Sequence, residues 1–177
     1  MSGVIVARTE EVDAHVLASA RELMYRTFDD MAEDDWQHAL HGTHAFVLDE
    51  GQVTAHASLV ARTFLHGGRP LRVGYVEAVA VRSDLRRRGL GSRVMAPLEA
   101  LIGGAGFDLG ALGTTDEGAA FYAARGWQPW RGPLGCVTDD GIVETPEERG
   151  AVLVLAAGAE LDLDGELLCD WRPGDVW

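Results

Sequence analysis

The chain has 177 residues, of which 47% are hydrophobic, and this length and composition suit a single domain over residues 1–177. Acidic residues outnumber basic ones by 28 to 15, giving a formal net charge of -13. That balance argues against a nucleic-acid partner and suits a cationic ligand.

Targeting signals and metal motifs are not evident in the sequence. The apolar runs are too short to span a membrane, and the N-terminus does not have the pattern of a signal peptide. Cys136 and Cys169 lack metal-ligand spacing and form no disulfide framework. We therefore expect a cytoplasmic protein with reduced thiols, a buried Cys169, no bound metal and no membrane association.

The sequence pattern of the N-terminal half predicts one strand, one helix and then three strands. Residues 3–8 predict a short strand, and Thr9 is expected to be the N-cap of an amphipathic helix extending to residue 28. Residues 29–42 form an acidic loop or short helix. Turns at Glu50-Gly51 and Gly67-Gly68 separate the three strands, the last of which covers about 71–82 and ends in a continuous apolar run.

The C-terminal half alternates helices with short apolar strands. The expected elements are a helix over about 89–103 ended by Gly103-Gly104, a strand over 107–114, a helix from Asp116 that stops at Gly126, and a strand over 151–157. A proline-containing loop or strand precedes the last strand, and a tail follows it. The element order predicts an α+β fold with a mixed central sheet flanked by helices.

Three arginines lie directly before a glycine turn. Arg86, Arg87 and Arg88 run into Gly89-Leu90-Gly91, between the buried strand and the helix. Glycines let backbone N–H groups approach phosphate oxygens, and a helix N-terminus adds partial positive charge, so the pattern suits a pyrophosphate. The general nucleotide motifs GxxxxGK[ST] and GxGxxG do not fit. The alternative interpretation is a basic surface turn.

Several stretches resemble a known family. The segment RRRGLG is similar to the R/Q-x-x-G-x-G/A signature of the GCN5-related N-acetyltransferases, in which this loop grips the pyrophosphate of acetyl-CoA. The segments GYVEAVAVRSDLR, FYAARGWQPWRGP and LLCDWRPGDVW resemble the aminoglycoside 2′-N-acetyltransferases, over about Arg21 to Trp177. The resemblance implies that family's fold, acetyl-CoA as cosubstrate, and a homodimer. It also implies acetyl-CoA contacts from Val79, Val81, Arg86, Arg87, Arg88, Gly89, Gly91 and Ser92.

Two residues are candidates for the proton transfers. Glu77 interrupts an apolar strand, where a carboxylate is costly unless it is paired or functional; the alternative is a strand residue facing solvent. The resemblance implies that Glu77 is the base, that the strand separates from its neighbour near its end, and that N–H groups around Val79 and Val81 become available. It implies Tyr122 as the acid that assists the thiolate, although a packed aromatic is the alternative.

The substrate side is expected to be acidic. The resemblance implies that the main-chain carboxylate of Trp177 reaches the site, with Trp171 and Trp177 docking the tail and with Asp170 and Asp175 adding negative charge. It further implies substrate contacts from Asp30, Asp35 and Glu148. Gly113 stands where relatives carry a small hydroxyl residue, which leaves the preferred drug open.

These residues together predict an acetyl-CoA-dependent enzyme that acetylates the 2′-amino group of aminoglycoside antibiotics and so confers resistance. One alternative is a related acetyltransferase acting on another amine, such as a polyamine, a cell-wall amino sugar or a thiol conjugate. A second alternative is a non-catalytic protein that sequesters aminoglycosides.

Overall fold

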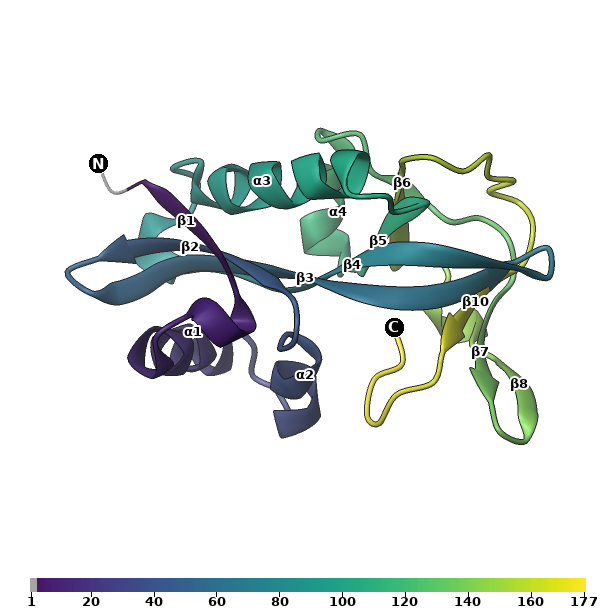
Figure 1. The fold of residues 1–177 in the computed structure, drawn as a ribbon, viewed down its shortest axis with the longest axis horizontal. Coiled ribbons are helices and arrows are strands. Elements are labelled where there is room, and N and C mark those ends of the chain that lie inside the picture. The colour runs from purple at the N-terminus through teal and green to yellow at the C-terminus, as the bar shows by residue number, and fades with distance from the viewer. Residues whose placement is uncertain (1–2) are drawn as a thin grey trace. The chain divides into compact units, whose positions relative to one another are not determined.

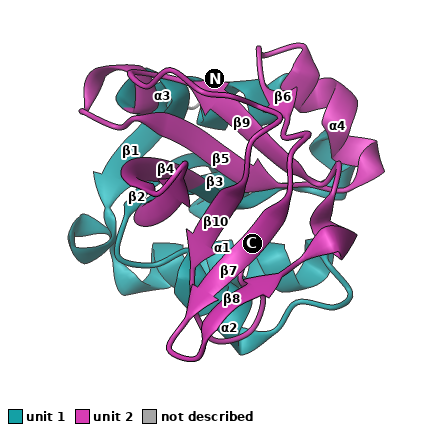
Figure 2. Cartoon of the chain, turned by 90° about the vertical axis from the view of Figure 1, so that its right-hand side faces the viewer, with its two compact units in different colours: residues 1–60, 76–101 teal, residues 61–75, 102–177 magenta. Residues whose placement is uncertain are grey.

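Two compact units make up the part of the chain that the computed structural model describes, residues 3–177. Residues 1–60 and 76–101 belong to unit 1, and residues 61–75 and 102–177 belong to unit 2 (Figure 2). Strands β3 (Gln52–His66) and β4 (Arg69–Val81) contribute to both units. The expectation of a single domain over 1–177 stays a prediction. Within residues 3–177, no helix is both long and apolar enough to cross a membrane.

Unit 1 is a layer of strands between helices. Strand β2 pairs with β1 on one side and β3 on the other, both antiparallel. Helices α1 and α2 lie on one face of these strands, and α3 lies on the other (Figure 1). The bounds are β1 Val4–Arg8, α1 Ala14–Thr27, α2 Glu33–His38, β2 Thr43–Asp49 and α3 Leu90–Gly104.

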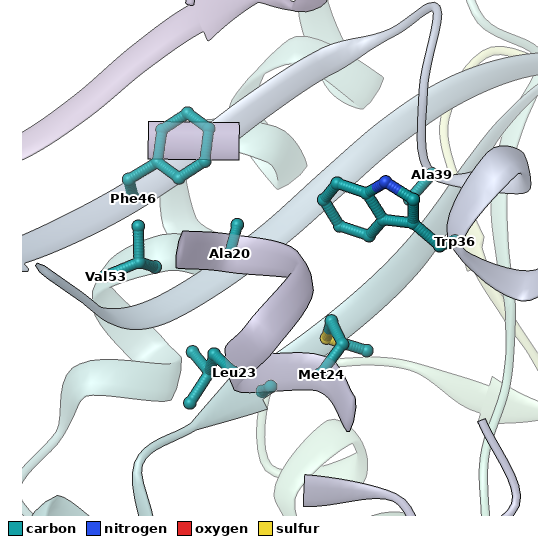
Figure 3. Packing of buried hydrophobic residues seen from close by; sticks show 8 residues of the cluster. Ala20, Leu23, Met24, Trp36, Ala39, Phe46 and Val53 are labelled. Atoms are coloured by element: carbon teal, nitrogen blue, oxygen red, sulfur yellow. The ribbon is translucent and has the colours of Figure 1, made fainter. Parts of the chain in front are cut away.

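The core of unit 1 joins α1 and α2 to the strands. Figure 3 shows Leu23 and Met24 of α1, Trp36 of α2, and Phe46 and Val53 of β2 and β3. All five are at most 6% exposed. Full burial of such side chains stabilises by roughly 1.5–3 kcal/mol each, so the short helix α2 is held mainly by Trp36.

Unit 2 extends the sheet in both directions from the hairpin of β3 and β4. The strand order is β6-β9-β5-β4-β3-β10-β7-β8. Strand β5 is parallel to β4, and β10 is parallel to β7, which makes the sheet mixed. The bounds are β5 Leu109–Gly113, α4 Asp116–Ala123, β6 Gln128–Pro129, β7 Leu134–Thr138, β8 Gly141–Glu144, β9 Val152–Ala156 and β10 Leu167–Asp170.

The predicted elements agree with these bounds in most places. Both predicted turns are confirmed, and each contains residues of positive φ that suit glycine. The first helix begins at Ala14, so the predicted cap at Thr9 is wrong: the Thr9 hydroxyl oxygen instead accepts a hydrogen bond from the Gly42 N–H at 3.1 Å. Helix α3 ends at Gly104, which confirms its predicted end at Gly103-Gly104. Strands β7, β8 and β10 were not expected as separate elements.

Both cysteines are free and buried, and they lie opposite each other in the β7–β10 ladder. Burial raises the pKa of the Cys169 thiol to about 12. The thiol therefore stays protonated and unreactive at neutral pH. This confirms the expected burial of Cys169.

Two histidines pack against each other in the interior of unit 1. His44 of β2 and His56 of β3 are both fully buried, and His44 Nδ1 lies 2.9 Å from His56 Nε2. Burial lowers the pKa of His44 to about 4 and that of His56 to about 3, the latter with help from the neighbouring ring. Both rings are therefore neutral in the folded protein at pH values where an exposed histidine is charged.

We expect stability to fall as the pH decreases below about 6.5. The unfolded chain then protonates both histidines while the folded protein does not, so the free energy of unfolding decreases by up to about 1.4 kcal/mol per pH unit for each ring. Urea unfolding at pH 7 and pH 5 measures this loss. A free energy of unfolding that is equal at the two pH values would contradict neutral burial of the pair.

Candidate functional site

Strand β4 changes direction next to Glu77. Ala78 has φ +53°, a left-handed conformation that is uncommon for a residue with a side chain. Its carbonyl oxygen accepts a hydrogen bond from His56 Nδ1 at 2.8 Å. The parallel pairs of β4 with β5 run from Val73 to Tyr75, whereas β4 itself continues to Val81. This register agrees with the expected separation of the strand near its end.

The backbone of β4 after Ala78 presents two N–H groups, those of Val79 and Val81, on one edge of the strand. The Arg82 N–H donates to the Thr54 carbonyl of β3 at 2.9 Å. Because successive N–H groups alternate between the two edges of a strand, those of Val81 and Val79 are directed away from β3. Glu77 is half-buried, next to the fully buried Val76.

The arginine-glycine turn has the backbone geometry of an anion-binding loop. After a 3₁₀ turn over Ser83–Leu85, Arg87 and Gly89 adopt φ values of +60° and +78°. The Gly89 carbonyl accepts the first hydrogen bond of α3, from Arg93, so the N–H groups of residues 90–92 lie in the first helical turn. Such groups, together with the helix dipole, bind phosphate oxygens.

Charge in this turn comes from exposed arginines. The side chains of Arg86, Arg87 and Arg88 are all exposed. Arg82 is used locally, since its guanidinium binds both oxygens of Asp84 at 2.7 and 3.1 Å. The hydrogen bond from Arg82 is the main cause of a lowered Asp84 pKa. The triple-arginine segment can therefore place up to three cations beside a bound pyrophosphate.

Asp30 and Asp35, both in unit 1, differ in their surroundings. Asp30 is exposed in the turn before α2. Asp35 is half-buried, and its Oδ2 accepts the Ala32 N–H at 2.8 Å, which caps the N-terminus of α2. Asp35 therefore has a structural role whether or not it also contacts a ligand.

Tyr122 lies on α4 in unit 2 and is 8% exposed. Its ring packs edge-on against Phe121 and Trp127, with ring centroids 5.0 and 6.2 Å away. A Cβ atom on Gly118 would lie 2.3 Å from the Thr114 hydroxyl and 3.4 Å from the Tyr122 ring. Glycine at this position therefore leaves the space that the tyrosine ring and Thr114 occupy.

The C-terminal segment is held in place by Trp177. This side chain is 4% exposed, its indole N–H donates to the Thr145 hydroxyl at 2.8 Å, and its ring packs edge-on against Phe64. The predicted docking of Trp177 is confirmed. The same prediction for Trp171 is wrong, because that side chain, directly after the last strand, is 59% exposed.

Two arginines fix the backbone of this segment. Buried Arg62 donates to the Asp170 carboxylate and to the Val176 carbonyl, each at 2.8 Å. Arg172 donates to the main-chain oxygen of Trp177 at 2.8 Å. Since Arg62 neutralises Asp170, the expectation that Asp170 adds free negative charge is wrong.

The carboxylate of Glu148 is close enough to Asp175 of the C-terminal segment to be repelled by it. Burial, followed by repulsion from Asp175 and Glu147, raises the pKa of Glu148. The Asp175 carboxylate also accepts the Trp177 N–H at 3.0 Å. A Cβ atom on Gly113 would lie 3.5 Å from the Tyr75 hydroxyl and 3.9 Å from the Trp177 carbonyl carbon, so a small side chain would fit there.

The predicted residues are divided between the two units. Unit 1 contains Asp30, Asp35, Glu77, Val79, Val81, Arg86, Arg87, Arg88, Gly89, Gly91 and Ser92, and unit 2 contains Tyr122, Glu148, Asp175 and Trp177. Sequence reasoning missed the histidine pair, Arg62 and Thr145. A usable signal existed only for the histidines, which occupy inward positions of otherwise apolar strands.

Comparison with known proteins identifies the family of this chain. Residues 10–127 match the model of the acetyltransferase (GNAT) family. A relative named aminoglycoside 2′-N-acetyltransferase, from Mycolicibacterium fortuitum, is 42% identical over 97% of this chain and 90% of its own.

Solved structures share the fold. The GNAT protein YhbS from Escherichia coli, solved with CoA, has a TM-score of 0.64 at 16% identity, covering 97% of this chain and 91% of that one. A GNAT acetyltransferase from Brucella melitensis, solved with acetyl-CoA, has a TM-score of 0.61 at 16% identity, covering 94% and 96%. The resemblance seen in the sequence and the expected α+β fold are therefore confirmed, and the chain belongs to the GNAT family of acetyltransferases.

Proposed function

We propose that the protein transfers an acetyl group from acetyl-CoA to the 2′-amino group of aminoglycoside antibiotics and thereby confers resistance to them. The observation that carries this proposal is the 42% identity, over nearly the full length of both chains, to an enzyme named for that reaction. The acidic charge of the protein suits a substrate with several ammonium groups.

Acetyl-CoA fits the residues present in unit 1. Arg87 and Gly89 have positive φ values, which form a turn directly before a helix of 15 residues. The exposed arginines of this turn supply cations. We assign pyrophosphate binding to Arg86, Arg87, Arg88, Gly89, Gly91 and Ser92. The thioester makes the acetyl carbonyl electrophilic. The Val79 N–H is assigned to its oxygen and the Val81 N–H to the pantetheine arm.

Glu77 is proposed to remove a proton from the substrate ammonium, directly or through water, so that the free amine can attack. An alkyl ammonium has a pKa near ~10.4, so little free amine exists at neutral pH without a base. The new C–N bond forms, the C–S bond breaks, and the nitrogen then loses its second proton to solvent, which offsets the proton that the thiolate takes up. Tyr122 is proposed to donate a proton to the departing thiolate or to stabilise it by hydrogen bonding.

Drug binding is assigned to carboxylates of both sequence halves. Asp30 and Asp35 are proposed to contact ammonium or hydroxyl groups, as are Glu148, Asp175 and the main-chain oxygens of Trp177. Burial, and after it repulsion from Asp175, raises the pKa of Glu148, and a bound cation would relieve the repulsion, which supports this assignment. Each exposed ion pair contributes only about 0–1 kcal/mol, so affinity depends on several together.

A cytoplasmic location and a homodimeric state are also proposed. The buried, protonated Cys169 and the free Cys136 suit a reducing compartment. The family resemblance supports the dimer, and sedimentation of the purified protein tests it.

The reaction is tested with two aminoglycosides that differ at one position. We expect kanamycin B, which has a 2′-amino group, to gain one acetyl group at that nitrogen when incubated with acetyl-CoA, as seen by mass spectrometry with fragment mapping. Kanamycin A, which has a 2′-hydroxyl group, should stay unmodified at that position. Drug binding without release of CoA thiol would instead favour sequestration, and acetylation of polyamines alone would favour a different amine substrate.

The pyrophosphate loop is tested by a matched pair of glycine variants. Gly89 and Gly51 have φ values of +78° and +80°, and neither has an atom within 4 Å of a built Cβ. Both Gly89→Val and Gly51→Val therefore strain the backbone similarly. We expect Gly89→Val alone to raise the KM for acetyl-CoA, by at least about tenfold, a change equivalent to ~1.4 kcal/mol. An unchanged KM in folded Gly89→Val would reject the assignment.

Base and binding roles are separated by two glutamine variants. Glu77→Gln should lower kcat by about 100- to 10,000-fold without unfolding the protein, since only proton acceptance is lost. Glu148→Gln should leave kcat intact and raise the KM for the drug up to about fivefold. It should not lower the melting temperature, because the raised pKa means that ionised Glu148 destabilises the fold at neutral pH. A full-rate Glu77→Gln variant would remove Glu77 as the base.

A further inference from the structure

We propose that His56, supported by His44, is a positioning residue that aims the Val79 N–H at the oxygen of the reacting acetyl group. The inference rests on the proposed acetyl transfer. It uses two buried side chains in unit 1 that contact neither substrate in the proposed mechanism.

Hydrogen bonds connect Thr9, His44, His56 and the Ala78 carbonyl in a chain, and the carbonyl at its end determines where the protons lie. A backbone carbonyl only accepts, so His56 Nδ1, 2.8 Å from the Ala78 oxygen, must carry the proton. His56 Nε2 of the neutral ring then accepts, and the proton of the 2.9 Å contact lies on His44 Nδ1. His44 Nε2 in turn accepts from the Thr9 hydroxyl at 2.8 Å. Both rings are therefore Nδ1–H tautomers.

The peptide plane connects this chain to the reaction. The carbonyl of Ala78 and the N–H of Val79 belong to one peptide unit, which is trans and planar. Their two bonds point in opposite directions, so fixing the Ala78 oxygen toward His56 fixes the Val79 N–H away from β3. A hydrogen bond accepted by the carbonyl also polarises the peptide and strengthens its N–H as a donor.

The same contact holds a strained conformation. Left-handed φ at a residue such as Ala78 persists only where the surroundings over-determine it. Ala78 also packs against the core cluster that includes Trp36 and Phe46. His56 adds the directional restraint that apolar packing does not give, because packing does not orient a peptide plane.

A proton relay is a different role, and the geometry opposes it. The chain Thr9–His44–His56 ends at the Ala78 carbonyl, which does not titrate at neutral pH and so has no proton to pass on. Burial also keeps both rings neutral. The pair therefore acts through orientation.

Three variants of strand β3 test the inference. His56→Leu removes the donor at similar volume, whereas His56→Asn retains a nitrogen donor near the Nδ1 position. Thr54→Val is the matched control, because the buried Thr54 hydroxyl also donates to a backbone carbonyl, that of Val47, at 3.1 Å.

We expect His56→Leu to lower kcat by about 10- to 100-fold, less than the loss of an oxyanion donor itself, with little change in the KM for the drug. His56→Asn should recover most of that rate, and Thr54→Val should keep the wild-type kcat even where its melting temperature falls. A folded His56→Leu variant with the wild-type kcat would overturn the inference, as would equal losses in His56→Leu and Thr54→Val.

Nitrogen NMR of the wild-type protein gives a readout that needs no substrate. Both rings should be neutral Nδ1–H tautomers at pH 6, and the Val79 amide signal should shift in His56→Leu but not in Thr54→Val. An Nε2–H tautomer at His56 overturns the inference even if His56→Leu does not fold. Failure of the wild-type protein to acetylate any aminoglycoside refutes the proposed function instead, whatever the tautomer.

Discussion

The left-handed backbone at Ala78 is the constraint on which the proposed reaction centre in unit 1 depends. Strand β4 pairs with β5 only from Val73 to Tyr75, and Ala78 lies between this paired part and the last residues of β4. Without the kink, Glu77 and the N–H groups that follow it would belong to a regular ladder. A non-glycine residue in this conformation costs about 1–3 kcal/mol, and the buried histidine bond and the apolar cluster around Ala78 offset that cost.

In unit 2, side-chain contacts order a segment without regular secondary structure, residues 171–177. The residues after β10 have no helix or strand, and chain ends are commonly disordered. Here one buried tryptophan supplies apolar area, while Arg62 and Arg172 bind the main-chain oxygens of Val176 and Trp177. Arginine suits this task because its planar group donates several hydrogen bonds in fixed directions.

The acidic side chains of this protein differ in whether a basic partner compensates their charge. The carboxyl group of Glu148 is partly buried next to Asp175, and its raised pKa shows that the ionised form is disfavoured in the free protein. The proposed polycationic substrate would relieve the repulsion between Glu148 and Asp175. By contrast, Glu33 and Asp170 are neutralised by Arg21 and Arg62, so they serve the fold. Acidic residues of this chain therefore differ in whether their charge is compensated within the fold.

The sequence by itself determined the family, the arginine-glycine turn and most elements, because apolar periodicity, glycine turns and local motifs are encoded over short distances. It did not determine the partners of polar residues. Thr9 resembled a helix cap but bonds Gly42 and His44, and Asp170 resembled a free charge but pairs with a residue 108 positions away. Trp171 and Trp177 looked alike in the tail, yet only one is buried. These partners depend on which distant strands meet, so they became visible only in the folded chain.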